Sequence, residues 1–226
     1  MAAVLSPSTA ARPATSALLA CGIAAGPLYV LVGALEMLTR PGFDPLRHDL
    51  SLMANGDFGW IHTSLLIVCG LLVVASSVGM RNALRGGLAS IWGPWLVALY
   101  GIGLIGAGIF AADPAYGFPP GTPADEHSVS LHGLMHLVSG AIGFVGLIAA
   151  CFVVARRFSA RKQAGWAAFS RVTGVVFAAA FVGIASGSQQ GGAITTIVIV
   201  AFTAAVVLGW AWLSAVQLQL TREVAV

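Results

Sequence analysis

Six long apolar segments constrain this chain more than any other feature of its sequence. A helix needs about 20 mainly apolar residues to cross a bilayer, and runs of that length lie at residues 17–38, 60–80, 91–111, 131–155, 166–186 and 193–216. The composition agrees, because 58% of the residues are hydrophobic and only 8% are charged, whereas about a quarter are charged in soluble domains. The sequence therefore predicts an all-α integral membrane bundle of six transmembrane helices.

Basic residues are distributed unequally between the two sets of helix ends. Lysine and arginine next to membrane spans are retained in the cytoplasm. One set of ends carries Arg12, Arg81, Arg85, Arg156, Arg157, Arg161, Lys162, Arg171 and Arg222. Only Arg40 and Arg47 lie at the other set. We therefore expect both termini to be cytoplasmic, with the connections around 40–59, 112–130 and 187–192 facing outward.

No polar linker divides the chain, so a single domain is expected. We predict a disordered cytoplasmic leader at 1–15, rich in Ala, Ser, Pro and Thr, one six-helix transmembrane domain at 16–218, and a cytoplasmic tail at 219–226. The net charge of +3 comes from residues in short loops rather than from a stripe, which argues against nucleic acid. Membrane lipids are the expected partners of these residues, and the sequence indicates neither a soluble partner nor an oligomeric state.

Small residues four positions apart indicate where the helices approach one another. Such spacing lets two helix backbones come into close contact within a membrane. It occurs at Gly22 and Gly26, at Gly103 and Ala107, and at Ser139 and Gly143. Tryptophans, by contrast, favour the head-group level of the bilayer. We expect that location for all six: Trp60, Trp92, Trp95, Trp166, Trp210 and Trp212.

Histidines and acids gather on the side that we expect to face outward. All five histidines lie there: His48, His62, His127, His132 and His136. The outward connections also hold six of the eight acids: Asp44, Asp49, Asp57, Asp113, Asp125 and Glu126. Any binding or chemistry is therefore expected on this side.

His132 and His136 suggest a metal site. They are four residues apart on a predicted helix, so they project from one face about 6 Å apart along its axis. Asp113 could supply a third ligand for zinc, which takes histidine nitrogen and carboxylate oxygen; His62, His48 and Asp49 are alternatives. A zinc-activated water would make these residues catalytic in a lipid or ester hydrolase. The alternative is that the histidines bond to backbone and join the helices together.

Haem is a related possibility, with His62 and His136 as axial ligands from two different helices. A second haem near the inner side is not expected, because no histidine lies there. The sequence therefore does not indicate electron transfer across the membrane.

Glu36 lies within the first span, and an acid in a membrane is a functional candidate. It could handle protons, as in a proton-coupled transporter or an acid-initiated isoprenoid cyclase. The structural alternative is an ion pair with Arg40, four residues later in the favourable order.

Four residues of the first outward connection and the second span form a candidate ligand-binding set: Arg47, His48, Asp49 and His62. The planar fork of an arginine suits a phosphate head group. Arg47 and His48 could bind one, although acids outnumber basic residues on this side. A salt bridge from Arg47 to Asp44 or Asp49 is the alternative.

Several short motifs in order resemble one known family. They are Arg-Pro-Gly-Phe-Asp-Pro-Leu-Arg-His at 40–48, Gly-Trp at 59–60, Ala-Asp-Pro at 112–114, Gly-Phe-Pro-Pro-Gly-Thr-Pro at 117–123, Leu-His-Gly-Leu-Met-His at 131–136 and Gly-Trp-Ala-Trp-Leu at 209–213. Together they resemble the bacterial membrane family known as domain of unknown function 998, over nearly the whole chain. The resemblance implies a multi-span bundle in a bacterial cytoplasmic membrane and no established activity.

The leading hypothesis is a membrane protein with an outward polar pocket that stabilises the bundle or binds a lipid or another small ligand. The alternative is the metal-dependent hydrolase, followed by the cyclase and the transporter. A transporter is disfavoured because inverted repeats and broken helices are not apparent.

Overall fold

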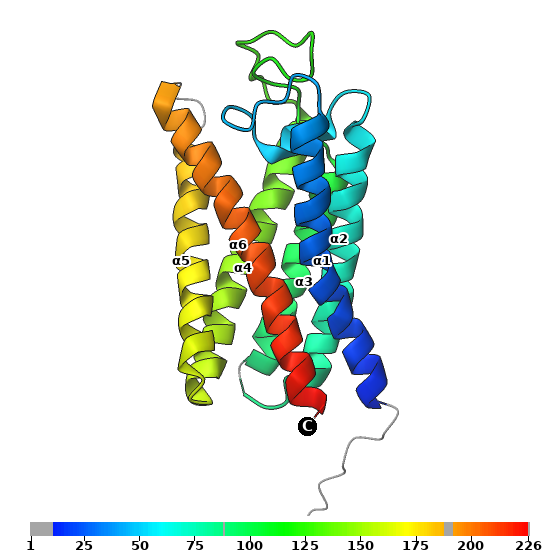
Figure 1. Ribbon diagram of the computed structural model, residues 1–226, viewed down its shortest axis with the longest axis vertical. Coiled ribbons are helices and arrows are strands. Elements are labelled where there is room, and N and C mark those ends of the chain that lie inside the picture. The colour runs from blue at the N-terminus through cyan, green and yellow to red at the C-terminus, as the bar shows by residue number, and fades with distance from the viewer. Residues whose placement is uncertain (1–10, 88, 188–191, 226) are drawn as a thin grey trace, which may run out of the picture.

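The computed structural model describes residues 11–87, 89–187 and 192–225. Within these ranges the chain forms six long helices and one short 3₁₀ helix (Figure 1). They are α1 (Ala11–Thr39), η1 (Leu50–Ala54), α2 (Gly59–Ala83), α3 (Ala89–Ile109), α4 (Leu131–Ala160), α5 (Ala164–Gly187) and α6 (Gly192–Ala225). Each long helix is apolar enough to cross a membrane. The predicted all-α fold with six spans is therefore confirmed.

The helices extend beyond the apolar runs at both ends of the chain. α1 already begins at Ala11, within the predicted leader, and α6 continues to Ala225, through most of the predicted tail. Residues 1–10 of the leader lie outside the described part of the chain, as do residues 188–191 of the third predicted outward connection.

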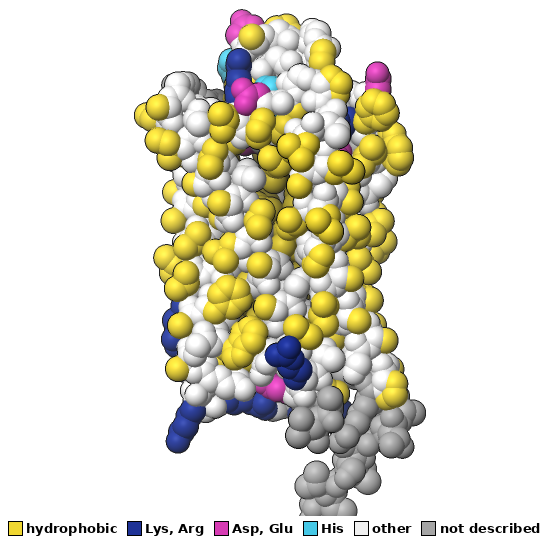
Figure 2. Space-filling view, viewed as in Figure 1, with side chains coloured by type: hydrophobic (Ala, Val, Ile, Leu, Met, Phe, Trp, Pro, Cys, Tyr) yellow, Lys and Arg dark blue, Asp and Glu magenta, His cyan; other side chains and the backbone are white. Residues whose placement is uncertain are grey.

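The bundle has two chemically different ends. The start of α1 and the end of α6 lie at the same end (Figure 1), as an even number of crossings requires. Figure 2 shows most lysine and arginine side chains at this end, which we call the basic end. At the opposite end Figure 2 shows acidic and histidine side chains, and the long connections 40–58 and 110–130 lie there. We call it the loop end.

Glycines bring the helix backbones together where small residues were predicted to do so. A Cβ added to Gly26 of α1 would lie 2.9 Å from the backbone oxygen of Trp210 in α6. A Cβ added to Gly103 of α3 would lie 2.6 Å from Cα of Gly143 in α4. Both positions need glycine because two backbones approach closely there. The interpretation of these small residues as helix interfaces is confirmed.

The direction of α6 determines where the bundle is loosely packed. Next to Gly26, α6 lies against α1, but near the loop end it lies against α5, where a Cβ on Gly187 would meet Val198 at 3.0 Å. Figure 1 shows the corresponding diagonal path of α6. α1 and α6 therefore separate towards the loop end.

Two tryptophans do not lie where the sequence predicted them. Trp210 and Trp212 are 1% and 0% exposed, so the head-group interpretation is wrong for both. Because α6 continues to Ala225, these residues lie inside the bundle rather than at the end of a span. Trp60, in contrast, is 65% exposed at the start of α2.

Candidate functional site

A cavity of about 420 Å³ occupies the loop-end half of the bundle. Residues from all six long helices and from the start of η1 line it. Most of the lining is aliphatic or aromatic, with a small group of polar and hydrogen-bonding side chains. These are Tyr29, Asp49, Ser51, His62, Tyr100, His136 and Trp210. A largely apolar pocket with few polar groups is typical of binding sites for small molecules.

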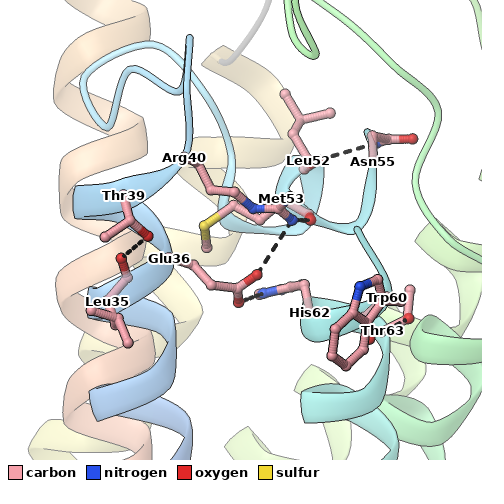
Figure 3. A network of polar contacts seen from close by, with 10 residues as sticks. All are labelled: Leu35, Glu36, Thr39, Arg40, Leu52, Met53, Asn55, Trp60, His62 and Thr63. Carbon is pink, nitrogen blue, oxygen red and sulfur yellow. Dashed lines mark hydrogen bonds and ion pairs between the residues drawn. The ribbon is translucent and has the colours of Figure 1, made fainter. Parts of the chain in front are cut away.

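A buried polar network borders the cavity between α1 and α2 (Figure 3). Glu36 Oε1 lies 3.3 Å from Nη2 of Arg40, and Glu36 Oε2 lies 2.9 Å from Nδ1 of His62. Arg40 also donates a hydrogen bond to the backbone oxygen of Met53 in η1. All three charged or titratable side chains are at most 6% exposed. The predicted pairing of Glu36 with Arg40 is confirmed, and His62 is a further partner that the sequence analysis did not assign.

The bond to Glu36 determines how His62 presents its ring. Because a carboxylate can only accept, Nδ1 of His62 carries the hydrogen and donates it. Nε2 of His62 is buried and has no hydrogen-bond partner among the described residues. In the neutral imidazole this nitrogen is an acceptor. His62 therefore brings an unpaired acceptor to the wall of the cavity.

His136 contributes a second imidazole from α4. Its Nδ1 lies 2.9 Å from the backbone oxygen of Ala107 and 2.8 Å from that of Phe110, so it donates to the C-terminal end of α3. These carbonyls belong to the last turn of a helix, where partners within the helix are missing. The contact fixes the ring and leaves Nε2 without a partner in the described part of the chain. His136 is thus bonded to backbone and also lines the cavity.

Two further buried atoms at the cavity lack partners among the described residues. One is Oδ1 of Asp49, and the other is Nε1 of Trp210. Burial raises the pKa of Asp49 from 3.8 to about 6, because a carboxylate loses hydration there. The Asp49 side chain does not cap η1, although Asp49 precedes that helix. The polar side of the cavity therefore offers acceptors, one indole N–H donor, and the hydroxyls of Tyr29, Ser51 and Tyr100, which can donate or accept.

The other two members of the predicted ligand-binding set lie outside the cavity. Nη2 of Arg47 donates to the backbone oxygen of Ala124 at 3.0 Å. His48 accepts a bond from the backbone N–H of Asp44 at Nδ1 and donates from Nε2 to the oxygen of Tyr116. Arg47 and His48 therefore join the two long connections to each other. Of the four predicted residues, only Asp49 and His62 line the cavity.

The three predicted metal ligands each bond to another part of the protein. Asp113 accepts bonds from the backbone N–H and the hydroxyl of Ser130, both at 2.7 Å. Nδ1 of His132 lies 3.1 Å from the backbone oxygen of Ala111, and His136 bonds to α3 as described above. The described residues include no group of three or more His, Cys, Asp or Glu side chains that could hold a metal ion. The arrangement thus resembles the structural alternative for these residues, and no described donor set is assembled for zinc.

Aromatic residues of the cavity were not identified from the sequence. Tyr29 stacks on Trp210 with ring centroids 4.8 Å apart and meets His62 edge-on at 6.3 Å. Tyr100 lies 5.5 Å from the same indole. The sequence held one sign of this arrangement for Tyr29. It precedes Glu36 by seven residues, and two turns of helix place both residues on one face of the helix.

Comparisons with known proteins give a family but no relative of known activity. A family model described as a protein of unknown function, DUF998, matches residues 23–219. The resemblance inferred from the sequence motifs is confirmed. No match was found among curated proteins or among solved structures.

Proposed function

This chain belongs to the DUF998 family of proteins of unknown function, and we propose that it binds an uncharged, hydroxyl-bearing amphiphile in the cavity. One observation carries the proposal: buried polar atoms without partners, on His62, Asp49 and Trp210, lie at the wall of a mainly apolar cavity. Each buried unpaired group costs about 1–3 kcal/mol. A ligand that supplies the missing hydrogen bonds would remove that cost.

The unpaired atoms indicate the chemistry of the ligand's head. Oδ1 of Asp49 accepts hydrogen bonds, as does Nε2 of His62 and of His136 when the imidazole is neutral, so these atoms match hydroxyl groups, which donate them. No lysine or arginine lies among the described residues that line the cavity. Arg40, the nearby cation, is already bonded to Glu36 and to the backbone. A phosphate or carboxylate head would therefore meet no balancing cation among the described lining residues.

The apolar part of the cavity suits a hydrocarbon tail. Phe144, Phe181 and Phe202 line it from α4, α5 and α6. Two other lining residues, Leu137 of α4 and Ala185 of α5, are exposed at the outside of the bundle. The cavity therefore reaches the surface that would face lipid between these helices. We propose that the ligand enters from the membrane by this route.

The bonds of Glu36 disfavour the other functions that its position suggested. Both side-chain oxygens of Glu36 are already bonded, one to Arg40 and one to His62, so neither is free to act as the acid of a cyclase. The separated positions of Asp113, His132 and His136 give the metal hydrolase no supporting geometry. Binding is therefore the function that the geometry supports best.

For the location, we propose a bacterial cytoplasmic membrane with the basic end inside. The unequal distribution of lysine and arginine supports this orientation. Asp125→Cys, exposed at the loop end, should react with a membrane-impermeant maleimide in intact cells, whereas Lys162→Cys at the basic end should react only after lysis. The reverse pattern would show that the orientation is inverted.

The binding proposal is tested with a radiolabelled 1-O-alkylglycerol and protein in nanodiscs. We expect saturable binding that an unlabelled alkylglycerol displaces and an alkyl phosphate does not. His62→Gln and His136→Gln should each weaken binding about fivefold to tenfold, the value of one lost hydrogen bond of about 1 kcal/mol.

His132→Gln is the matched control, because His132 lies one turn from His136 but does not line the cavity. It should bind the probe as the unchanged protein does. Absence of saturable binding to the unchanged protein would refute the proposed function.

A further inference from the structure

We infer that His62 is a general base and that the cavity hydrolyses an ester bond of the amphiphile that it binds. This inference rests on the proposed function, because the ester must first occupy the cavity. The chemical class of substrate is an uncharged ester of a fatty acid and a polyol, such as a monoacylglycerol. Such a molecule combines hydroxyl groups that Asp49 and His136 fit, which leaves Nε2 of His62 for water, with an acyl chain that the phenylalanine-lined part fits.

The first support is the arrangement of Glu36 and His62. The carboxylate holds Nδ1 of the imidazole at 2.9 Å, and the opposite nitrogen, Nε2, is buried without a partner. A base of this kind needs a third group that fixes its tautomer and orientation. Arg40 holds the other carboxylate oxygen at 3.3 Å, so the carboxylate is itself fixed.

The second support is an independent feature, the unpaired N–H of Trp210. This donor is buried and has no partner among the described residues. The ring of Tyr29 contacts both Trp210 and His62, with centroid distances of 4.8 and 6.3 Å. A base and a free donor thus line the same cavity, and both lie next to the ring of Tyr29. Acyl transfer requires this combination, because a donor must stabilise the oxygen on which negative charge develops.

The reaction uses water as the only co-reactant. A water molecule gives a proton to Nε2 of His62 while its oxygen forms a bond to the ester carbonyl carbon. The carbonyl electron pair moves to oxygen, which accepts a hydrogen bond from Nε1 of Trp210. When the intermediate collapses, the bond to the alcohol oxygen breaks and that oxygen takes the proton from His62. The products are a fatty acid and a free polyol, and His62 returns to its initial state.

The experiment compares two probes with the same protein in nanodiscs: a monoacylglycerol, whose release of fatty acid is measured, and the 1-O-alkylglycerol, which has no ester bond. We expect release of fatty acid with a solvent deuterium isotope effect on kcat, because a proton moves in the transition state. His62→Gln should lower kcat at least a hundredfold, the usual contribution of a general base. Glu36→Gln, which affects a positioning residue, should lower kcat by a larger factor than it raises the Kd of the alkylglycerol.

Trp210 and Trp212 form a matched pair for the donor. Both are buried tryptophans on α6, but Nε1 of Trp212 donates to Ser170 at 3.0 Å, away from the cavity lining. Trp210→Phe should lower kcat at least tenfold, whereas Trp212→Phe should leave kcat unchanged in the folded fraction. Equal effects of the two changes would overturn the role of the Trp210 donor.

The two probes separate the two proposals. Binding of the alkylglycerol without release of fatty acid from the ester would overturn the hydrolase and leave the binding function intact. Failure of the alkylglycerol to bind would refute the binding function itself. Release of fatty acid that His62→Gln leaves unchanged would also overturn the inference.

Discussion

Buried polar side chains have different surroundings in the two halves of the bundle. In the basic-end half, Nε2 of Gln217 donates to the hydroxyl of Ser76 at 3.1 Å, and Trp212 donates to Ser170. Three buried atoms there, Oε1 of Gln217, Nη1 of Arg157 and Oε1 of Gln163, have no partner among the described residues, but none of these residues lines the cavity. In the loop-end half, Nε2 of His62 and Nε1 of Trp210 have no partner among the described residues. Both halves therefore hold buried unpaired atoms, and the difference is that those of His62 and Trp210 belong to residues that line a cavity.

Close backbones explain why Gln217 pairs with Ser76 in the basic-end half. A Cβ on Gly22 would lie 2.7 Å from the side chain of Gln217 and 2.8 Å from that of Ser76, so three helices meet there. Towards the loop end α6 leaves α1, and the cavity lies beside His62 and Trp210, whose unpaired atoms a ligand could reach. The proposed binding cavity therefore lies where the six helices pack least closely. Three sets of substitutions test this comparison of the two halves.

The largest effect on stability is expected for Arg40→Met. The change leaves Glu36 as a buried carboxylate without its cation, which costs about 3–5 kcal/mol. Arg47→Met is the control, because Arg47 is exposed and bonds only to a backbone oxygen of the second connection; about 1 kcal/mol or less is expected. Thermal unfolding in detergent measures both, and equal losses would show that the Glu36 network does not stabilise the loop-end half.

A smaller loss, about 3 kcal/mol at most, is expected for Gly79→Ala in the closely packed half. The new Cβ would lie 2.8 Å from the backbone nitrogen of Leu19 and from Cβ of Leu18, so α1 and α2 must move apart. Gly140→Ala is the matched change beside the cavity, where the nearest atom, in Phe144, would be 3.9 Å away. Its melting temperature should stay unchanged or rise slightly, because alanine favours a helix. The comparison fails if the two alanines cost the same.

The smallest effect is expected for Asp49→Asn, and it depends on pH. The raised pKa of about 6 means that folding favours protonated Asp49; its contribution is complete below pH 3.8 and is lost as the pH rises through 6. Asparagine cannot ionise, so the variant should be more stable at pH 7, by about 1–3 kcal/mol, and similar near pH 4. Melting temperatures between pH 4 and 8 check this, and parallel curves for the two proteins would contradict a buried acid at this site.

Local patterns in the sequence predicted those features that depend on nearby residues. The six spans follow from runs of apolar residues, and the contact between Glu36 and Arg40 follows from their spacing of one helical turn. Gly26 and Gly103 were recognised as contact points for the same reason. Asp49 and His62 were named as candidates because of their chemical type, but their common cavity was not predicted.

Contacts between distant segments explain the other results. His62 is 26 residues from Glu36 on another helix, and nothing in the local pattern of either residue indicates the other. Arg47 and His48 were predicted to bind a lipid head group, but their side chains bond to backbone oxygens of the second connection. Trp210 was expected at the level of the lipid head groups because the predicted sixth span ended at residue 216. The helix α6 continues to Ala225.

The sequence by itself determined that this chain crosses a membrane six times and that histidines and acids gather at the end opposite most of its arginines. Hydrophobicity and charge are properties of each residue, and the bilayer acts on each segment separately. Only the tertiary structure decided which polar atoms remain unpaired, because the tilt of α6 sets the distances between helices. The cavity and its candidate base are consequences of that tilt.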